Sequence, residues 1–527
     1  MLVLASFCVW KPVLTKTGGY GEEDMTLQTF FAKSLVRAID GDAGDQPTAL
    51  RVSKLHKMAL GVLHQLLLSP YSKTLADMEL EDVLTARLIS TLNTKETYVQ
   101  VSLLDVLHAA FKLSLNRPTS QLGHLQQLSR LVDPTKIGPR SSTVSVEQEK
   151  AAPPPQLQPP QQLLKCLIGG FSSTSSRPVL DSWIFFLGEC LPLISDVIFQ
   201  MLIPLVECLC NQITITFESL KAVFRETERL HVPEAGGKSP ESTLVALLNG
   251  LEQILAIAHD RLRTEEHKSA GPKSPDAPST GFFGNMVSGV FSVESPQNRS
   301  ASANNRLAVL LCFQDTVRIC YSIWSWADIH NSNRSLDIGS KESWGYTSHR
   351  MKGRARRILE HMFAAETLEC LETLVELWPG RIAPMGERKV GSIFRLVNVL
   401  DGSRPKHTVP AIFNAIYSRT NPAALDPNMR STLTAELSDV DVAVFLVEYA
   451  RSLEEDAMDE IWADCMFFLR EVLANPFPHR QILPSLLSFT AILGEKVDNT
   501  NFGEQRRMRK ELGVGISRIL SGRCTLD

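Results

Sequence analysis

The segment Gly236-Gly237-Lys238-Ser239 could do chemistry, because these residue types in this order end a phosphate-binding loop. Such a loop also needs a glycine where Val232 stands, a strand before it, and a helix directly after the serine, where Pro240 follows. Without a cradle of backbone N–H groups, a phosphate is not held. We therefore interpret this segment as a turn.

The sequence contains no motif of a metal site or of a catalytic nucleophile. The twelve histidines are scattered, the ten cysteines contain no C-x-x-C pair, and neither H-E-x-x-H nor G-x-S-x-G occurs. The acidic clusters Glu454–Asp456 and Asp459–Glu460 fall at a helix junction, where carboxylates favour the start of the next helix. We predict no catalytic, cofactor-binding or metal-binding residues, no enzymatic activity and no small-molecule substrate. A helical enzyme with an unrecognised site is the alternative.

Two basic clusters could contact an anionic membrane or a protein partner. One opens a predicted helix at residues 350–357, and the other opens the last predicted helix at residues 506–510. A cation near an anionic bilayer contributes about 1 kcal/mol. The candidate contact residues are Arg354, Arg356, Arg357, Arg506, Arg507, Arg509 and Lys510. Solvated helix faces and nuclear-import tracts are the alternatives, whereas nucleic acid is disfavoured because no aromatic residues interleave with the cations.

An apolar segment at residues 281–293 stands inside an otherwise polar stretch. Its bulky side chains recur four residues apart, which would place them on one side of a helix. The candidate contact residues are Phe282, Phe283, Met286, Val290 and Phe291. The segment could insert into a membrane interface or dock into a groove of a partner. Packing back onto its own helices is the plainer alternative, and we favour it.

Length, composition and charge exclude several classes of protein. The chain has 527 residues, of which 44% are hydrophobic and 21% charged, so it is not a disordered protein. Its 54 basic and 58 acidic side chains give a net charge of −4, unlike the cationic surplus of a dedicated nucleic-acid binder. Cysteines that lie singly in apolar runs indicate free thiols in a reduced, cytosolic setting.

Two apolar stretches resemble targeting or membrane segments. Residues 1–10 lack a basic flank and end at Lys11-Pro12, so we predict a core segment and not a signal peptide. Trp183–Cys210 carries three carboxylates and two prolines. Its longest charge-free run is about half a bilayer span, which favours buried helices of a soluble protein.

Nearly every ordered stretch has the period of an amphipathic helix. In Leu80–Leu88 and Val99–Leu115 apolar residues recur three and four apart, which places them on one face. Residues 244–262, 307–326, 358–378, 433–453, 461–473 and 482–493 repeat the pattern. The alternating stretch Ile213–Phe217 is short, and we predict a helix there too.

The breaks between these stretches are short and contain Pro, Gly or Asn. Helices of about 15–20 residues joined by tight turns bury their apolar faces by stacking as antiparallel pairs. We therefore predict an all-α fold, namely an α-solenoid of HEAT/TPR-like helix pairs interrupted by disordered linkers. No strict repeat consensus is visible.

Composition divides the chain into five parts. We predict a helical-repeat block at 1–140, a Pro/Gln-rich linker at 141–162, a second helical block at 163–266, a Ser/Pro/Gly-rich linker with the apolar segment at 267–302, and a C-terminal helical-repeat block at 303–521. Ser239, Ser274 and Ser295 each precede a proline, so they are either sites for proline-directed kinases or plain turn residues.

Several long strings resemble the middle-to-C-terminal region of Dopey proteins. SRPVLDSW begins at Ser176, ECLPL at Glu189, IFQMLIPLVEC at Ile198 and VQVSLLDV at Val99. FFGNMVSG from Phe282, with NRL from Asn305, and FAAETLECL from Phe363 look most like fungal members. The similarity extends from Val52 to Lys510 and includes no catalytic motif.

The resemblance implies a large helical-repeat protein, peripheral on the cytosolic face of Golgi and endosome membranes. It implies a non-enzymatic scaffold in vesicle-mediated protein transport between endosomes and the trans-Golgi, and in filamentous fungi a link to cell polarity. The implied protein partners are a relative of the large Arf exchange factors and an aminophospholipid flippase. A peripheral membrane sensor that uses Phe282–Phe291 and the basic clusters is the alternative.

The sequence also departs from the family pattern. Full-length members are several times longer and begin with their own N-terminal domain, and family sequence is expected to continue after Lys510. We expect a fragment or a truncated gene model. A severed solenoid would expose an apolar end, which predicts poor solubility.

Overall fold

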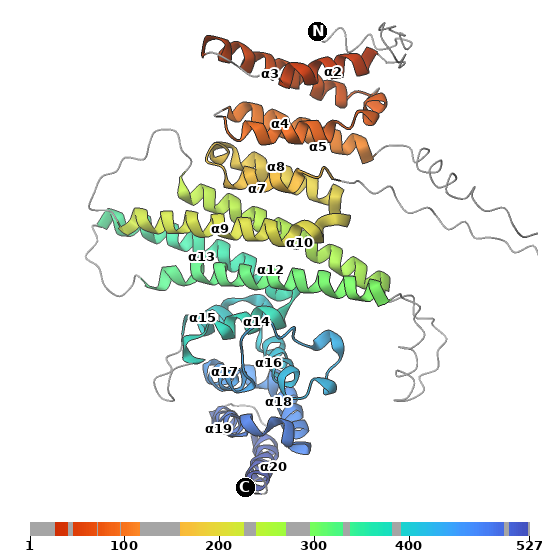
Figure 1. Cartoon of the computed structure of the whole chain (residues 1–527). Helices are drawn as coiled ribbons and strands as arrows, with labels where there is room; N and C mark the ends of the chain where they lie inside the picture. The colour runs from red at the N-terminus through yellow and green to blue at the C-terminus, as the bar shows by residue number, and fades with distance from the viewer. Residues whose placement is uncertain are drawn as a thin grey trace, which may run out of the picture. The chain divides into compact units, whose positions relative to one another are not determined.

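The regular structure of the chain is helical. The computed structural model describes residues 27–40, 46–70, 72–94, 96–115, 159–225, 239–269, 296–329, 338–381, 391–499 and 505–524 (Figure 1). Across these ranges no strand occurs, and contacting helices pack side by side. The all-α prediction is thus confirmed. The predicted linker residues 141–158 and 270–295 lie outside the described ranges.

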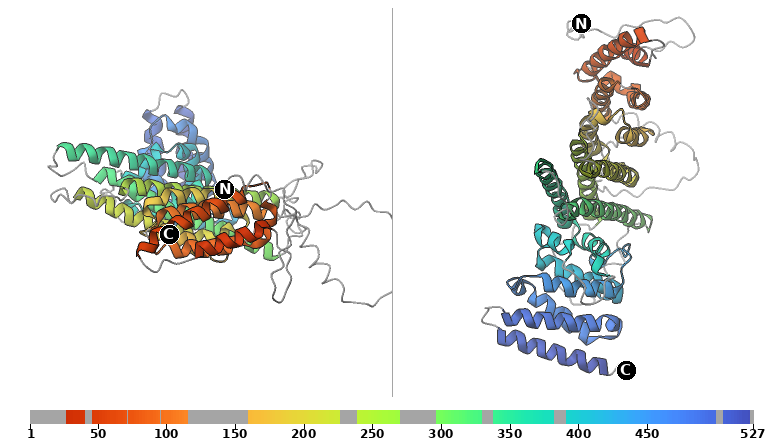
Figure 2. Two further views of the ribbon diagram at one scale, coloured as in Figure 1. Left: turned by 90° about the horizontal axis from the view of Figure 1, so that it is seen from above. Right: turned by 90° about the vertical axis from the view of Figure 1, so that its left-hand side faces the viewer.

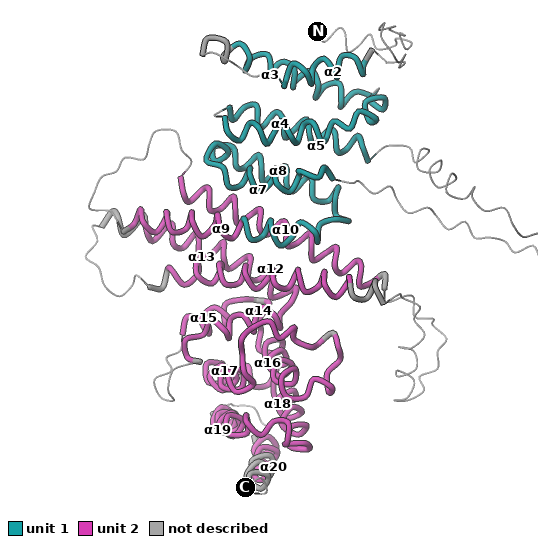
Figure 3. Tube along the Cα trace, viewed as in Figure 1, with its two compact units in different colours: residues 1–208, 233–238 teal, residues 209–232, 239–527 magenta. Residues whose placement is uncertain are grey.

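Two compact units make up the chain. Unit 1 comprises residues 1–208 and 233–238, and unit 2 comprises residues 209–232 and 239–527 (Figure 3). The division falls within helix α9 (Ile198–Arg225).

Unit 1 is built from helices that pair with their neighbours in sequence. Its elements are α2 (Leu27–Asp40), α3 (Gln46–Leu67), η1 (Ser72–Met78), α4 (Leu80–Thr91), α5 (Thr97–Leu115), α7 (Leu163–Ser172), η2 (Arg177–Val179), α8 (Leu180–Cys190), η3 (Leu191–Val197) and the start of α9. α2 packs on α3, α4 on α5, and α7 on α8, while α3 and α8 both pack on α5. Figures 1 and 2 show the red and orange pairs of this unit lying one after another.

Trp183 of α8 is the centre of the unit 1 core. Its side chain is fully buried, and its indole N–H donates to the Gln100 side-chain oxygen of α5 at 3.4 Å. The Gln100 amide in turn donates to the carbonyl of Thr91 at 3.2 Å. Gly170 of α7 makes room for the indole, because a Cβ there would lie 2.3 Å from it. Trp183 of α8 thus contacts α5 and α7 directly, and Gln100 connects it to the end of α4.

Unit 2 begins with three long helices. They are α10 (Pro240–Ser269), α12 (Pro296–Ile329) and α13 (Ile338–Ala365), which follow the second half of α9. α12 packs against α10, α13 and α14. These helices have 30, 34 and 28 residues, longer than the sequence pattern predicted. α10 and α12 also extend into the stretch at 267–302 that was predicted as a linker.

Shorter helices complete unit 2. They are α14 (Thr367–Glu376), η4 (Pro379–Arg381), α15 (Ser392–Val399), η5 (Asp401–Ser403), α16 (Pro405–Thr420), η6 (Pro422–Ala424), η7 (Pro427–Met429), α17 (Asp439–Ser452), α18 (Ala457–Ala474), η8 (Phe477–Ile482), α19 (Leu483–Asn499) and α20 (Gln505–Cys524). Contacts run in chain order, from α14 to α16, from α16 to α17 and α18, and from these to α19 and α20.

Most helical predictions are confirmed, and two boundaries differ. Ile213–Phe217 lies within α9, as predicted. The predicted helix at 358–378 is interrupted at Glu366, whose φ of −143° and ψ of 74° are not helical. The predicted helix at 433–453 starts later, at Asp439, because Ser438 and Asp441 form a capping box there. Leu433 has a φ of 55° and belongs to an irregular segment before the cap.

Candidate functional site

The predicted apolar contact residues Phe282, Phe283, Met286, Val290 and Phe291 lie outside the described residues, as do Ser274 and Ser295. Ser239 is described, and its hydroxyl oxygen accepts a hydrogen bond from the backbone N–H of Ser242 at 3.2 Å. That contact caps the first turn of α10. The end of the Gly-Gly-Lys-Ser string therefore serves as a helix start.

Part of the basic cluster on α13 holds that helix against α10. Arg350 pairs with Glu241 at 2.7 Å, and His361 lies 2.6 Å from Glu252. Arg354 pairs with the same Glu252, and its side chain is only 14% exposed. Because both partners come from α10, these contacts join two elements about a hundred residues apart in sequence.

Arg356 and Arg357 are the other candidate cations of this cluster. Arg356 pairs with Glu360 at 2.8 Å within α13, and its side chain is 40% exposed. Arg357 is exposed. Arg356 lies two residues from Arg354 and therefore on another side of α13, whereas Arg357 lies three residues from Arg354 and shares its side.

The second basic cluster lies on α20. Arg509 pairs with Asp498 of α19 at 2.6 Å, and Arg507 pairs with Glu511 at 3.5 Å. Arg506 and Lys510 are exposed. The cluster therefore presents cations to solvent on a helix that Met508 and Leu512 anchor by burial.

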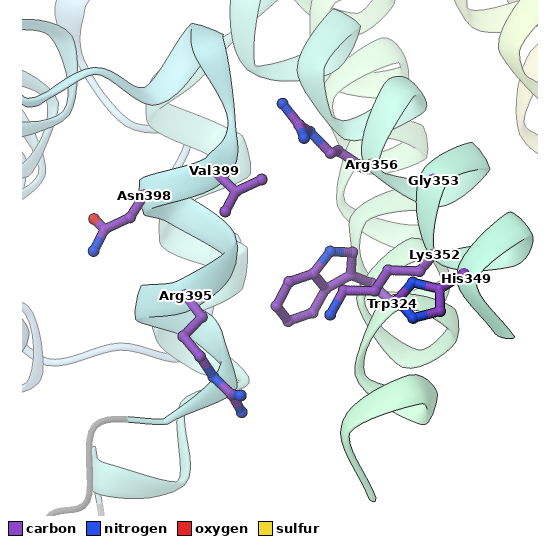
Figure 4. A pocket seen from close by; sticks show the side chains of 8 residues that line it. All are labelled: Trp324, His349, Lys352, Gly353, Arg356, Arg395, Asn398 and Val399. Atoms are coloured by element: carbon purple, nitrogen blue, oxygen red, sulfur yellow. The ribbon is translucent and has the colours of Figure 1, made fainter. Parts of the chain in front are cut away.

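A basic pocket lies between α12, α13 and α15. It has a volume of about 480 Å³ and is lined by Trp324, His349, Lys352, Gly353, Arg356, Arg395, Asn398 and Val399 (Figure 4). The ammonium group of Lys352 sits 4.2 Å from the centre of the Trp324 ring. The sequence did not predict this pocket, because only its α13 residues belong to a cluster of basic residues that the sequence shows. Arg395 stands alone in the sequence.

A smaller cavity of about 220 Å³ lies in unit 1 between α5 and α8. Its lining includes Asp105, His108, Asp181 and Phe185. Phe185 is 65% exposed. Burial lowers the pKa of His108, and neighbouring Lys112 lowers it further. Ser182 also lines this cavity, but among the described residues no hydrogen bond joins its hydroxyl to the His108 ring, so His108 is not placed to activate it.

Two buried carboxylates of α14 are structural. Glu372 accepts hydrogen bonds from Arg419 at 2.5 Å and Ser431 at 2.6 Å, and Glu369 accepts from the backbone and hydroxyl of Thr432. Burial raises the pKa of Glu369. Together they attach the irregular segment before α17 to α14.

No group of three or more His, Cys, Asp or Glu side chains is placed to hold a metal ion within the described part of the chain. Seven of the thiols found there are buried in the core, and the Cys208 thiol is half-buried. Burial raises the pKa of Cys166, Cys190 and Cys312 to about 12. A thiol of this kind is a poor nucleophile at neutral pH.

Three stretches are long and apolar enough to cross a membrane by length and composition. They are Arg177–Phe224, Pro240–His267 and Ala301–Trp326. Each buries about half of its most apolar window inside the protein, at 44%, 56% and 56% respectively. The first is also interrupted by η3 between α8 and α9. The buried side of each stretch packs against other helices of the chain.

Comparison with known proteins shows consistent similarity to one family. The family model described as DOP1 C-terminal matches residues 445–526, from within α17 to the end of α20. Protein dop1 of Emericella nidulans is 48% identical over 477 residues, 89% of this chain. Protein DOP1 of Saccharomyces cerevisiae is 30% identical over 362 residues, 66% of this chain. The alignments cover 25% and 20% of these two relatives, so the chain spans a quarter or less of their length.

Proposed function

Since the chain belongs to the Dopey family, we propose that it is a region of a non-enzymatic scaffold for vesicle-mediated protein transport between endosomes and the trans-Golgi. The observation that carries the proposal is the 48% identity with a fungal Dop1 protein over 89% of this chain. Such identity extends through both compact units and is not confined to one motif.

We propose that the helix pairs form an α-solenoid. In unit 2 the contacts between helices follow chain order from α14 to α20. Helices that pack mainly on their sequence neighbours leave broad outer faces for other proteins. Large apolar side chains stand on those faces: Phe185 and Phe467 are each 65% exposed, and Phe477 is 70% exposed. Apolar groups of this size in solvent favour protein contacts.

The proposed partners are a relative of the large Arf exchange factors and an aminophospholipid flippase, met at the cytosolic face of Golgi and endosome membranes. The support is family membership. The exposed cations Arg357, Arg506 and Lys510 would favour an anionic membrane surface.

Affinity capture from a fungal lysate tests this proposal. We expect the tagged chain to recover one of the two named partners by mass spectrometry, above a tag-only control. Phe185→Asp and Phe467→Asp place a charge on an exposed face of each unit without disturbing the core. We expect at least one of them to reduce recovery. Failure of the unmodified chain to recover either partner contradicts the proposal.

The peripheral membrane sensor is the second candidate, and it depends on the sequence of residues 281–293. Replacing Phe282, Phe283 and Phe291 by Asp would abolish liposome binding if this segment inserts into the membrane. Unchanged liposome binding would reject the sensor while leaving the scaffold proposal standing.

A further inference from the structure

The first helix pair of unit 1 carries an exposed apolar surface. α2 and α3 pack side by side (Figure 1), and α5 and η1 pack against this pair. Four large side chains of the two helices, Phe30, Phe31, Leu55 and Met58, are each between 45% and 55% exposed. The ring centroids of Phe30 and Phe31 lie 6.1 Å apart. We call these four side chains the outer apolar surface.

Helical periodicity places this surface away from the core of unit 1. Met58 lies two residues before the buried Leu60, and Phe30 lies two residues before the buried Ala32. Two residues correspond to about 200° around a helix, so both exposed side chains are on the side opposite the buried one. Leu55 is three residues from Met58 and shares its side. Apolar groups of this size are unfavourable in water unless another apolar group covers them.

An apolar segment lies close to this surface along the chain. Residues 1–10 are apolar apart from Ser6 and contain no charged side chain, and the sequence predicts a core segment there. They lie outside the described residues, as do residues 11–26, which connect them to α2. A connection of sixteen residues extends to about 55 Å, whereas the 22 residues of α3 span about 33 Å. Residues 1–10 can therefore reach every part of the outer apolar surface.

We propose that residues 1–10 bind the outer apolar surface of α2 and α3 and cover it. The competing occupant is a second copy of the chain. A flexible connection of this kind gives an effective concentration on the order of mM, about a thousandfold above that of a second copy at micromolar concentration. The segment of the same chain therefore occupies the surface first. This contact goes beyond the proposed scaffold role and does not depend on it.

Cys8 reports on the proposed contact, because it lies within residues 1–10. The rate of its labelling by iodoacetamide in the native chain is measured by peptide mapping. The double variant Phe30→Asp with Met58→Asp places two carboxylates on the outer apolar surface. The matched control is Val83→Asp with Phe185→Asp, which replaces two exposed apolar side chains of α4 and α8 in the same unit and changes the net charge equally. Circular dichroism verifies that both variants are folded.

We expect Cys8 to be labelled about tenfold more slowly in the unmodified chain and in the control than in the outer-surface variant. A synthetic peptide of residues 1–26 gives the rate of an uncovered Cys8, and this comparison with the unmodified chain requires no variant. Labelling of the unmodified chain as fast as the peptide overturns the proposal, as does an equal rate in the outer-surface variant and the control. Protection of Cys8 that increases with protein concentration identifies a second copy as the occupant and also overturns it.

Discussion

Burial in the helical core raises the pKa of the cysteine thiols. Cys320 and Cys370 are fully buried, and burial raises the pKa of both thiols well above the ordinary value. Cys208 is half-buried beside the Ser172 hydroxyl at 3.4 Å. These thiols fill space between helices, as the free-thiol interpretation of the sequence required.

Thiol labelling tests this role. With iodoacetamide at pH 8, we expect Cys208 to react before the seven buried cysteines of the core, because the thiolate is the reacting species and the buried thiols hold little of it. A pKa of about 12, as for Cys166, leaves about one part in 10⁴ ionised at pH 8. Peptide mapping by mass spectrometry measures the order. Rapid native labelling of Cys320 or Cys370 would show that the core opens easily.

The buried side chain of His479 makes the stability of the folded chain depend on pH. The side chain is 2% exposed, and its ring centroid lies 5.5 Å from that of Tyr417. Burial lowers the pKa of His479, partly opposed by Asp439. In the unfolded chain the imidazole of His479 takes up a proton near pH 6.5, whereas in the folded chain it takes up the proton only at lower pH. The free energy of unfolding therefore falls as the pH drops below about 6.5.

We expect His479→Gln to have a smaller difference in urea midpoint between pH 7.5 and pH 5.5 than the unmodified chain. The reason is that the variant lacks the proton uptake on unfolding. His407→Gln, whose side chain is exposed, is the control and should keep the full difference. Equal pH differences in all three proteins would show that His479 titrates freely in the folded state.

At the scale of elements, close helix packing depends on a few small residues. Gly170 lies against the Trp183 indole, whereas Gly61 of α3 has no neighbour within 4 Å of an added Cβ. The two glycines look alike in sequence, since each lies in an apolar helical run.

Alanine substitutions distinguish them. Gly170→Ala should destabilise the chain by about 1–3 kcal/mol through overpacking, whereas Gly61→Ala should stabilise it by about 0.5–1 kcal/mol because a helical glycine is removed. Urea unfolding followed by circular dichroism measures both. A neutral Gly170→Ala would mean that the indole moves aside at no cost.

The sequence predicted the helices well because their apolar period is local. It could not predict the break at Glu366, since no Pro or Gly marks it. There the chain leaves helical geometry where the Glu366 carboxylate meets Arg306 at 3.1 Å and His259 at 3.4 Å. Both partners are distant in sequence, so no local signal reveals them.

The basic pocket could not be predicted either, because its residues are also distant in sequence. A run such as residues 350–357 shows its charges, but not which of them face another helix. Arg354 turned out to be paired with α10, whereas Lys352 and Arg356 line a cavity with Arg395. Only the packing of α12, α13 and α15 brings those groups together.

At the scale of the whole molecule, the apolar helices could be taken for membrane spans. We expect the chain to be released from fungal membranes by alkaline carbonate, because Arg177–Phe224, Pro240–His267 and Ala301–Trp326 bury much of their apolar surface against other helices. Immunoblotting of the supernatant and pellet measures the release, with an integral membrane protein as control. Complete retention in the pellet would indicate that at least one stretch spans the bilayer.

We propose that these helices are stabilised by their neighbours along the chain, as in a stack, and not by one shared core. Hydrogen exchange on Phe489→Ala tests it within unit 2. Phe489 of α19 is fully buried, so its loss should cost about 3–5 kcal/mol. α19 packs mainly on α17, α20 and η8.

We expect faster amide exchange in α17 to α20 of Phe489→Ala, with α10, α12 and α13 unchanged, since stacked helices transmit destabilisation only to their neighbours. Glu495→Ala, an exposed position on α19, should leave all exchange rates as they are. A uniform loss of protection across α10 to α20 would contradict the account, because it would reveal a single cooperative core.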